Sequence, residues 1–411
     1  MSNIRAFILL VLFTVVVSVF AMGARAEVFV QCPGDIDGDA IPDPLLPNGD
    51  PNPAYDPNVK CAHITAGDGF VTMADGTITY IFGFGDATGI PPDQVIEKGM
   101  LGSTFPAPTI VVDEGDEFYL TLTNVGMVMR PDLFDPHTIH WHGFPNAASV
   151  FDGVPDASIA INMLSSLTYY YKVVEPGTYM YHCHVEATEH MQMGMLGNLY
   201  VRPAQDKLPD GTDLNGFIHH TGYHYAYNDG DGSTYYDVDY AIQMGGFDPD
   251  FHLANETIQP LPFAEMKDKY PMLNGRGYPD TVNPNALPPP AGNANGGKPS
   301  QVLSSLITAT QGQKILLRIS NLNVTRFYTL ATTGIMMKVV GKDAKHLRGK
   351  NGENLYIKTY SITLGGGESV DVILDTAQVA PGTYFLYTTN LNYLTNNEED
   401  FGGMMTEIRI Q

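Results

Sequence analysis

The sequence predicts an all-β protein in which two similar β-sandwich domains follow an irregular N-terminal extension. Composition is the first reason, because the 411 residues include 42 Gly, 29 Pro and 23 Tyr but a single Trp, which favours turns and strands over helices. The second reason is a period-two apolar pattern, and the third is an internal repeat. The length by itself also indicates two domains.

Two segments show the apolar alternation of half-buried strands. Residues 117–123 (EFYLTLT) and 314–320 (KILLRIS) are both apolar at their second, fourth and sixth positions, the period of a strand with one buried face. No long segment shows the 3.6-residue period of an amphipathic helix. We therefore expect strands and turns through most of the chain.

The internal repeat joins further landmarks to these two strands. Pro-Gly-Thr-Tyr at 176–179 recurs at 381–384, and Gly-Met at 194–195 recurs at 403–404. Landmarks in the same order, with a spacing that drifts slowly, are expected of two homologous domains whose loops differ in length. The resulting division is a signal peptide at 1–26, an N-terminal extension at 27–63, a first domain at 64–203, a linker or insertion at 204–262 and a second domain at 263–411.

The first 26 residues have the features of a secretion signal. Arg5 precedes an apolar run at residues 7–20, and Ala24-Arg25-Ala26 offers a small-residue cleavage site. An uncleaved anchor is the alternative, but about 14 apolar residues are few for a membrane span. We expect a secreted or periplasmic protein that has no membrane span once the signal is removed.

The net charge of the chain limits the kinds of molecule that it is expected to bind. The chain has 22 Lys+Arg against 45 Asp+Glu, a net charge of −23. Such an acidic protein repels phosphate, which excludes nucleic-acid binding and mildly favours cationic partners.

The N-terminal extension predicts a disulfide and a calcium loop. Cys32 and Cys61 bracket a segment rich in Pro and Asp, and an oxidising compartment favours their pairing. Within that segment acidic residues surround a glycine turn, an arrangement that resembles thrombospondin type-3-like calcium loops. A solvated acidic loop is the alternative. The expected calcium ligands are Asp35, Asp37, Asp39 and Asp43.

Histidine carries the strongest chemical signal. Six of the 12 histidines fall in two short clusters of the first domain, HTIHWHG at residues 137–143 and YHCHVEATEHMQMGM at residues 181–195. Isolated histidines are usually structural, and zinc also binds His and Cys. Two such clusters in one domain instead favour copper.

Ligand chemistry separates the clusters into two sets. A thiolate, two imidazoles and a distant thioether are the ligands of electron-transfer copper. One loop carries Cys183, His190 and Met195, and His137 of the other cluster closes this set.

The remaining four histidines predict a second copper site. Alternate residues of a strand share a face, so His140 and His142 point the same way, as do His182 and His184. Because His182 and His184 flank Cys183, a few covalent bonds would connect the two sites.

The pattern H-x-x-H-x-H-G followed by H-C-H…H-x-x-x-x-M resembles the multicopper oxidase family of laccases and their relatives. The resemblance runs over most of residues 64–411, and the segments at 269–276 and 318–321 resemble the copper-free second domain of those oxidases. It implies tandem cupredoxin-like Greek-key β-sandwiches. The ligands it implies are His137, Cys183, His190 and Met195 for type 1 copper, His140 for type 2 copper, and His142, His182 and His184 for the type 3 pair.

By this resemblance the protein would be a secreted copper-dependent oxidoreductase. Electrons would enter at type 1 copper and pass to the histidine-bound copper centre, where oxygen is the expected acceptor. The expected donors are phenols, reduced metal ions or a redox protein. Met191 and Met193 could line an entrance for a soft metal ion, although methionines in a loop usually pack.

Three departures from the family pattern are visible. Cys183 and His190 are two residues further apart than in the usual laccase loop. Tyr387, Thr388 and Thr389 occupy the second-repeat positions of His182, Cys183 and His184. Only four of the eight histidines of a trinuclear cluster are present, and there is no further H-x-H pair in the sequence.

We expect a homo-oligomer, and a neighbouring subunit could supply the histidines that this chain lacks. Two copies could pool their four-histidine sets across a two-fold axis. Alternatively, four histidines at or near the linker could reach the copper of a neighbouring subunit, although a surface or structural role is the usual one for such residues. These histidines are His219, His220, His224 and His252.

Two other functions remain open on sequence grounds. The layout also resembles copper nitrite reductase, a trimer in which a histidine of the next subunit completes the catalytic site. Thr389 would stand at the position of that histidine, and His140 at the position of the family's catalytic Asp. The other alternative is a non-catalytic electron carrier with type 1 copper alone.

Overall fold

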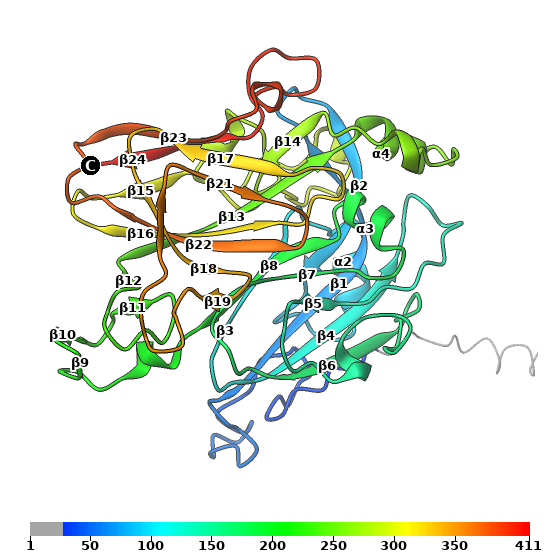
Figure 1. The fold of residues 1–411 in the computed structure, drawn as a ribbon. Coiled ribbons are helices and arrows are strands. Elements are labelled where there is room, and N and C mark those ends of the chain that lie inside the picture. The colour runs from blue at the N-terminus through cyan, green and yellow to red at the C-terminus, as the bar shows by residue number, and fades with distance from the viewer. Residues whose placement is uncertain (1–27) are drawn as a thin grey trace, which may run out of the picture.

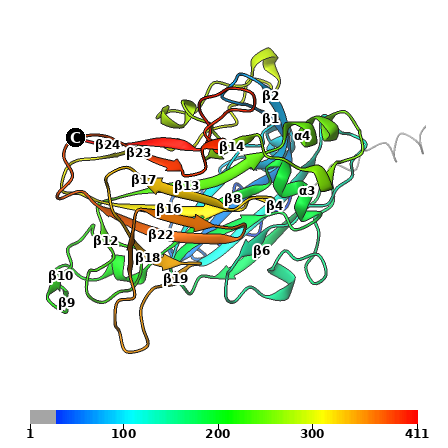
Figure 2. The same ribbon diagram turned by 45° about the horizontal axis from the view of Figure 1, so that its top comes forward.

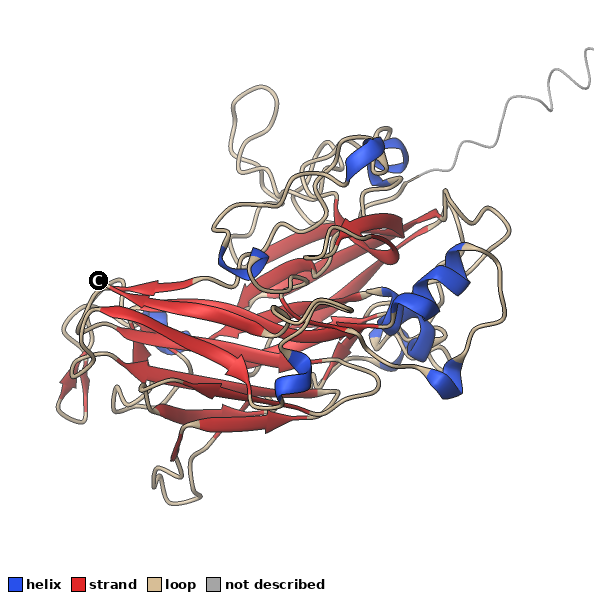
Figure 3. Ribbon diagram, turned by 90° about the horizontal axis from the view of Figure 1, so that it is seen from above, coloured by secondary structure: helices blue, strands red, loops and turns tan. Residues whose placement is uncertain are grey.

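The computed structural model describes residues 28–411, so the expected signal at 1–26 lies outside the described residues. Within residues 28–411, no helix is both long and apolar enough to span a bilayer. Figure 3 shows that strands dominate and that the helices are short and peripheral, which confirms the all-β class. The α-helices in this part of the chain are α2 (Val95–Gly99), α3 (Ala187–Met193) and α4 (Pro249–Glu256).

The first sandwich consists of two four-stranded sheets, ordered β2-β1-β4-β6 and β3-β8-β7-β5. Its apolar core lies between the sheets. The strands are β1 (Val59–Thr72), β2 (Ile78–Asp86), β3 (Ala107–Asp113), β4 (Glu117–Gly126), β5 (His140–His142), β6 (Ser166–Lys172), β7 (Gly177–His182) and β8 (Leu196–Arg202).

The second sandwich pairs a sheet ordered β14-β13-β16-β22-β18-β19, with β20 beside β18, and a sheet ordered β15-β24-β23-β17-β21. In Figure 1 it occupies the upper left, in yellow to red, beside the blue and cyan first sandwich. Its strands are β13 (Val238–Phe247), β14 (Tyr270–Leu273), β15 (Ile307–Ala309), β16 (Lys314–Asn321), β17 (Tyr328–Thr332), β18 (Met337–Lys342), β19 (Lys345–His346), β20 (Ile357–Thr359), β21 (Ser361–Leu364), β22 (Glu368–Asp375), β23 (Gly382–Thr388) and β24 (Met405–Ile410).

Strand pairing shows that the internal repeat is structural. In the first domain β1 is parallel to β4 and antiparallel to β2, and in the second domain β13 is parallel to β16 and antiparallel to β14. The second sheets match as well, because β3–β8–β7 and β15–β24–β23 both consist of a parallel pair followed by an antiparallel one. The two alternating segments of the sequence lie in β4 and β16.

The segment expected as a linker contributes a strand to the second sandwich. Strand β13 starts at Val238 and pairs with β16 as far as Met244, so the second domain begins inside residues 204–262. Strand β1 likewise starts at Val59, inside the expected extension. The remainder of the linker forms two small sheets, β9 (Asp213–Leu214) with β10 (Phe217–Ile218) and β11 (His224–Tyr225) with β12 (Tyr235–Tyr236).

Close packing explains the two glycines near the end of β13. Its buried end contains Gly245 and Gly246, which strand propensity disfavours. A Cβ on Gly246 would lie 2.5 Å from the Tyr328 hydroxyl, and one on Gly245 would lie 3.4 Å from the Phe105 ring. The glycines therefore stand where neighbouring side chains approach the strand backbone.

The two sandwiches lie against each other (Figure 2), and hydrogen bonds join β7 to the second domain. Thr178 Oγ1 donates to Asp371 Oδ1 at 2.6 Å, and Ser369 Oγ donates to the Thr178 carbonyl at 2.7 Å. Ser320 Oγ donates to Asn198 Oδ1 at 2.8 Å. This interface places the end of β7, where the His-Cys-His sequence begins, against the second domain.

The N-terminal extension is tied to the first sandwich by the expected disulfide between Cys32 and Cys61. Since Cys61 lies in β1, the bond fixes the acidic loop beside the sheet. One carboxylate oxygen each of Asp35, Asp37 and Asp39 lie within 4.8 Å of one another.

Candidate metal centre

Antiparallel pairing of β5 with β7 brings the two histidine clusters together, with His140 opposite His182. His137 lies just before β5 and Cys183 just after β7. The Cys183 amide donates to the Met195 carbonyl at 3.1 Å, which continues the β7–β8 pairing. All of the expected ligands are thereby gathered at one end of the first sandwich.

The first set converges on the Cys183 sulfur. Its Sγ lies 3.2 Å from His190 Nδ1 and 3.8 Å from His137 Nδ1, and all three side chains are fully buried. Donors bonded to one ion at about 2.0–2.3 Å are themselves about 3.3–3.9 Å apart at roughly trigonal angles. The three donor atoms therefore fit a single metal ion.

Met195 lies beside this set. Its side chain is fully buried, and its amide donates to the His190 carbonyl at 2.8 Å. The backbone thus anchors Met195 to both Cys183 and His190. Its role as the thioether ligand stays a prediction.

The electrostatics of the first set favour a thiolate. Burial raises the pKa of the Cys183 thiol, but the His190 and His137 imidazoles outweigh burial and hold that pKa well below its usual range. Burial lowers the pKa of His190, yet Cys183 and Asp135 together raise it to about 10. A thiolate is the form in which cysteine binds a metal.

The second set consists of His140, His142, His182 and His184. The ring centre of His140 lies 5.2 Å from those of both His182 and His184. His142 Nδ1 lies 3.4 Å from His182 Nε2. The four imidazoles thus face a common space, as strand parity predicts.

Backbone carbonyls orient two of these rings. His140 Nδ1 donates to the Asp152 carbonyl at 2.6 Å, and His182 Nδ1 donates to the Cys183 carbonyl at 2.8 Å. Each ring therefore keeps Nε2 as a free lone pair. Burial lowers the pKa of His182 to about 3 and also lowers the pKa of His142, so both rings are neutral and able to bind a metal.

The second domain forms the far wall of the space before the four histidines. An open pocket of about 510 Å³ is lined there by Asn323, Arg326, Phe327 and Gly367. Gly367 has φ +89°, and a Cβ at this position would lie 2.9 Å from His142 Nε2. The backbone at Gly367 therefore limits where the His142 ring can lie.

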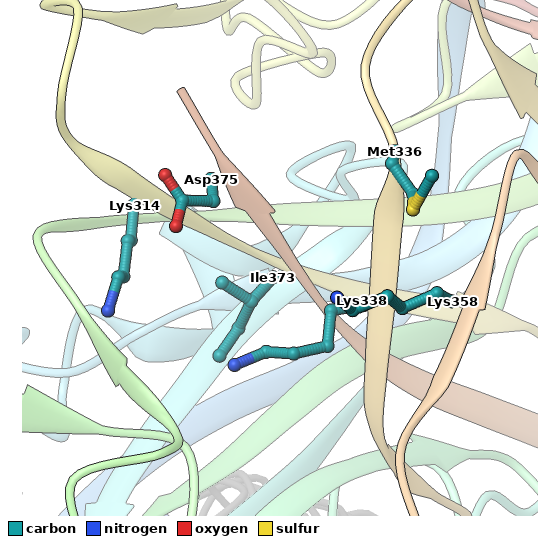
Figure 4. Close-up of a pocket in the computed structure, with 6 residues that line it drawn as sticks. All are labelled: Lys314, Met336, Lys338, Lys358, Ile373 and Asp375. Atoms are coloured by element: carbon teal, nitrogen blue, oxygen red, sulfur yellow. The ribbon is translucent and has the colours of Figure 1, made fainter. Parts of the chain in front are cut away.

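A second pocket, shown in Figure 4, has a different character. It measures about 310 Å³ and is surrounded by Lys314, Lys338 and Lys358 of the second domain, with one carboxylate, Asp375. Three ammonium groups repel a metal cation, so this pocket is no candidate for the metal centre.

The four histidines at or near the linker are engaged within their own chain. Each has a ring nitrogen within hydrogen-bonding distance of a partner: His219 with the Tyr225 hydroxyl, His220 with Asp210, His224 with Asp206, and His252 with the carbonyls of Tyr80 and Gln192. The structure gives no support to a role for them at a neighbour's copper.

The second domain has no comparable ligand set. Thr388, at the repeat position of Cys183, is buried opposite Leu330 of β17. Among residues 28–411, every cluster of three or more His, Cys, Asp or Glu with converging ligand atoms lies before residue 191.

Two acidic residues next to the first set were missed from the sequence. Asp135 Oδ2 lies 3.8 Å from His190 Nε2, and ligand atoms of Asp135, Glu186 and His190 lie within 4.8 Å of one another. Glu186 precedes His190 by four residues, which is the spacing of neighbours on one face of a helix. If a helix had been expected here, this spacing would have indicated that Glu186 lies beside His190.

Family models described as multicopper oxidase match residues 90–206 and 252–408, which together make up most of the chain. The chain belongs to the multicopper oxidase family. This membership agrees with the His-x-His and His-Cys-His ligand sets and implies copper as the metal.

Curated members of the family match only part of this chain. Multicopper oxidase MCE of Talaromyces pinophilus is 34% identical over 132 residues, 32% of this chain and 19% of that protein. Laccase 1 of Metarhizium acridum is 32% identical over 121 residues, 29% of this chain and 18% of that protein. The matched regions thus span less than a fifth of these two relatives.

Solved structures extend the likeness to the whole fold. The blue copper oxidase of Nitrosomonas europaea superposes with a TM-score of 0.61 at 24% identity, covering 86% of each chain. The copper nitrite reductase of the same organism gives 0.55 at 15% identity, covering 86% of this chain and 94% of that one. These likenesses confirm tandem cupredoxin-like sandwiches, a fold that oxidase and reductase share.

The Gly367→Ala substitution tests whether the second domain positions His142. The added methyl group would displace the ring, and we expect copper affinity of the four-histidine set to fall by about 10–100-fold, while the thiolate–copper absorption of the Cys183 set persists. Copper titration followed by visible absorption measures both. Gly312→Ala is the matched control, because Gly312 has φ +98° with nothing within 4 Å of its Cβ position. Equal copper affinity in the two variants would contradict the positioning role.

Proposed function

We propose that this chain is a secreted copper-dependent oxidoreductase of the multicopper oxidase type. In this proposal it takes electrons at a type 1 copper and passes them to a histidine-bound copper centre that reduces oxygen. The observation that carries the proposal is the position of Cys183 between His182 and His184. A single tripeptide then belongs to both ligand sets.

The residues present fit copper at both sets. His137 Nδ1, His190 Nδ1 and the Cys183 thiolate are the soft and borderline donors that copper prefers, and Met195 is the candidate thioether. His140, His142, His182 and His184 offer neutral imidazoles to the second set. When bound, copper would supply one-electron transfer at the first set and the reduction of oxygen at the second.

The protein's own contribution is a short and rigid connection. From Cys183 Sγ the covalent path runs through one backbone segment to the ring of His182 or His184. The hydrogen bond from His182 Nδ1 to the Cys183 carbonyl, at 2.8 Å, offers a second connection between the same residues. Full burial of Cys183 and His190 excludes water from the thiolate, which protects it from oxidation.

The incomplete four-histidine set supports the proposal that the protein is a homo-oligomer. It has four histidines where a complete trinuclear cluster takes eight, and the pocket before it is open. Phe327 at the rim of that pocket is 75% exposed, an unusual position for a large apolar side chain. We propose that a second copy of the chain covers this rim.

Nitrite reduction is the second candidate, because the copper nitrite reductase fold aligns over 94% of its length with this chain. An electron carrier with type 1 copper alone is the third. The acceptor distinguishes them: an oxidase consumes oxygen, a reductase consumes nitrite, and a carrier consumes neither.

We also propose that the N-terminal aspartate loop takes a calcium ion. The clustering of Asp35, Asp37 and Asp39 supports this, and Asp43 lies close enough that its Oδ2 accepts the Ile36 amide at 2.9 Å. Burial raises the pKa of Asp39, and its three acidic neighbours raise it further. A bound cation would relieve that repulsion.

Replacement of Cys183 by Ser tests the main proposal. A hydroxyl does not replace the thiolate, so we expect the intense visible absorption and at least about 99% of donor-driven oxygen uptake to disappear. Copper analysis, visible spectra and oxygen-electrode assays measure this on one preparation, with nitrite as the alternative acceptor. Oxygen uptake at the wild-type rate would contradict electron entry at Cys183.

Calcium binding is tested by thermal unfolding in calcium and in chelator. At a calcium concentration of about 100 times Kd, the loop should gain about 2.7 kcal/mol of stability, seen as a higher unfolding temperature. The Asp35→Asn/Asp37→Asn variant should lose this response. A wild-type protein with the same unfolding temperature in both buffers would refute the site.

A further inference from the structure

The pocket of the second domain that Figure 4 shows is basic, although the chain as a whole is strongly acidic. We call it the lysine pocket, and it measures about 310 Å³. Its lining residues are Lys314, Met336, Lys338, Lys358, Ile373 and Asp375. Three lysines and one aspartate leave two net positive charges in its wall. The lysine pocket shares no residue with either set of expected copper ligands.

Strand register places the charged side chains of this pocket on one face of the sheet. Lys314 of β16 lies opposite Asp375 of β22. Lys338 of β18 lies opposite Ile373, two positions before Asp375 on the same strand. Residues two apart on a strand share a face, so Lys314 and Lys338 stand on the same face, and Lys358 of β20, directly opposite Lys338, joins them. This is the outer face, because the alternate positions of these strands are buried in the core of the second domain.

The pairing of Lys338 with Lys358 is unfavourable by itself, because like charges directly opposite each other on neighbouring strands repel. Burial and the positive charges of Lys314 and Lys358 also lower the pKa of Lys338. The lysines that form ion pairs within residues 28–411 are Lys172, Lys207, Lys269, Lys342 and Lys345. The three lysines of the pocket are not among them, so a bound anion would offset a repulsion that no carboxylate of the described chain neutralises.

Neutral partners hold two of the ammonium groups in place. Lys338 Nζ donates to the Ser233 carbonyl at 2.7 Å and lies 5.4 Å from the centre of the Tyr356 ring. Lys314 Nζ lies 5.7 Å from the centre of the Tyr235 ring. Both ring distances are within the range of cation–π interactions. These contacts orient the lysines and leave their full charge for a ligand.

The donors of the lysine pocket suit a phosphate group. An ammonium group is a compact charge with three N–H donors, and the residues that line the pocket include no arginine, whose planar fork matches a carboxylate. Two net positive charges match a phosphate dianion, which forms above a second pKa of about 6. Ile373 and Met336 add apolar surface, and the pocket exceeds the volume of a single water molecule, about 30 Å³, roughly tenfold. It therefore has room for a small organic group beside the phosphate.

We propose that the lysine pocket binds a small phosphate dianion, either inorganic phosphate or the phosphate group of a monoester. This inference goes beyond the proposed function and does not depend on it. The net charge of −23 does not prevent such binding, because charges more than about 8 Å away are largely screened at physiological salt. A long polyanion would instead extend over the acidic surface around the pocket and be repelled.

Calorimetric titration of the copper-loaded protein with phenyl phosphate tests the inference. At about pH 8, where the phosphate is a dianion, and in calcium-free buffer of low salt, we expect Kd to rise about tenfold or more in Lys358→Gln and in Lys338→Gln. Each variant loses a charge-assisted hydrogen bond to the phosphate. Phosphate that binds at copper counts equally in all the proteins, so the difference between them reports on the lysine pocket.

The matched control is Lys267→Gln, which removes the same charge just before β14, at the opposite edge of the same sheet. It should bind phenyl phosphate with the wild-type Kd. An unchanged Kd in Lys358→Gln, or an equal rise in all three variants, overturns the inference. Lys358 is exposed, so Lys358→Gln keeps the test valid if loss of the contact between Lys338 and Ser233 disturbs the fold.

Two further ligands identify the source of the phosphate group. Tighter binding of phenyl phosphate than of inorganic phosphate assigns the pocket to a monoester, and equal binding assigns it to free phosphate. Heparin tests the polyanion alternative, and heparin binding that is tighter than that of phenyl phosphate and is lost in Lys358→Gln overturns the inference.

Thermal unfolding gives a second readout. Phenyl phosphate should raise the unfolding temperature of wild type and of Lys267→Gln, because a ligand that binds the folded state stabilises it, and should raise that of Lys358→Gln less. An equal rise in all three proteins, or the same rise in sodium chloride of equal ionic strength, overturns the inference. Visible spectra of the same samples report on the proposed function separately, since a missing thiolate–copper absorption refutes that function whatever the phosphate affinity.

Discussion

The antiparallel pairing of β5 with β7 is the constraint on which the metal centre depends. It sets His140 opposite His182, so that His137 and Cys183, just beyond the paired residues, meet in the core. A shift of one residue in this register would turn the histidines of one strand to the other face of the sheet. The buried core of the first sandwich holds the register, and a ligand geometry suited to copper follows from an ordinary packing requirement.

The second domain borders this centre and contributes none of the expected ligands. Its sheet binds β7 through Ser369 and Asp371, and its loops at Phe327 and Gly367 close one side of the four-histidine space. The two similar sandwiches thus have different roles. The first domain carries the expected ligands, and the second domain provides the surface that packs against them.

Much of this arrangement could be predicted from the sequence. Period-two apolar patterns located β4 and β16, repeated landmarks indicated tandem domains, and the parity of His-x-His and His-Cys-His predicted which rings converge. Strand β13 was harder to predict. Val238, Tyr240, Ile242 and Met244 alternate as in a strand, but the segment before them is rich in Tyr, Asp and Gly and indicates a linker, and Gly245 and Gly246 interrupt the pattern. The carboxylates of Asp135 and Glu186 beside His190 could not be predicted either, because the two residues are 51 positions apart in the sequence and only the fold brings them to one histidine.

The most direct test of this account is a crystal structure of the copper-loaded protein with anomalous data collected at the copper edge. The account predicts one anomalous peak among His137, Cys183 and His190, and at least one more among His140, His142, His182 and His184. A peak at the first set alone would leave an electron carrier, and the absence of a peak beside Cys183 would contradict the central claim.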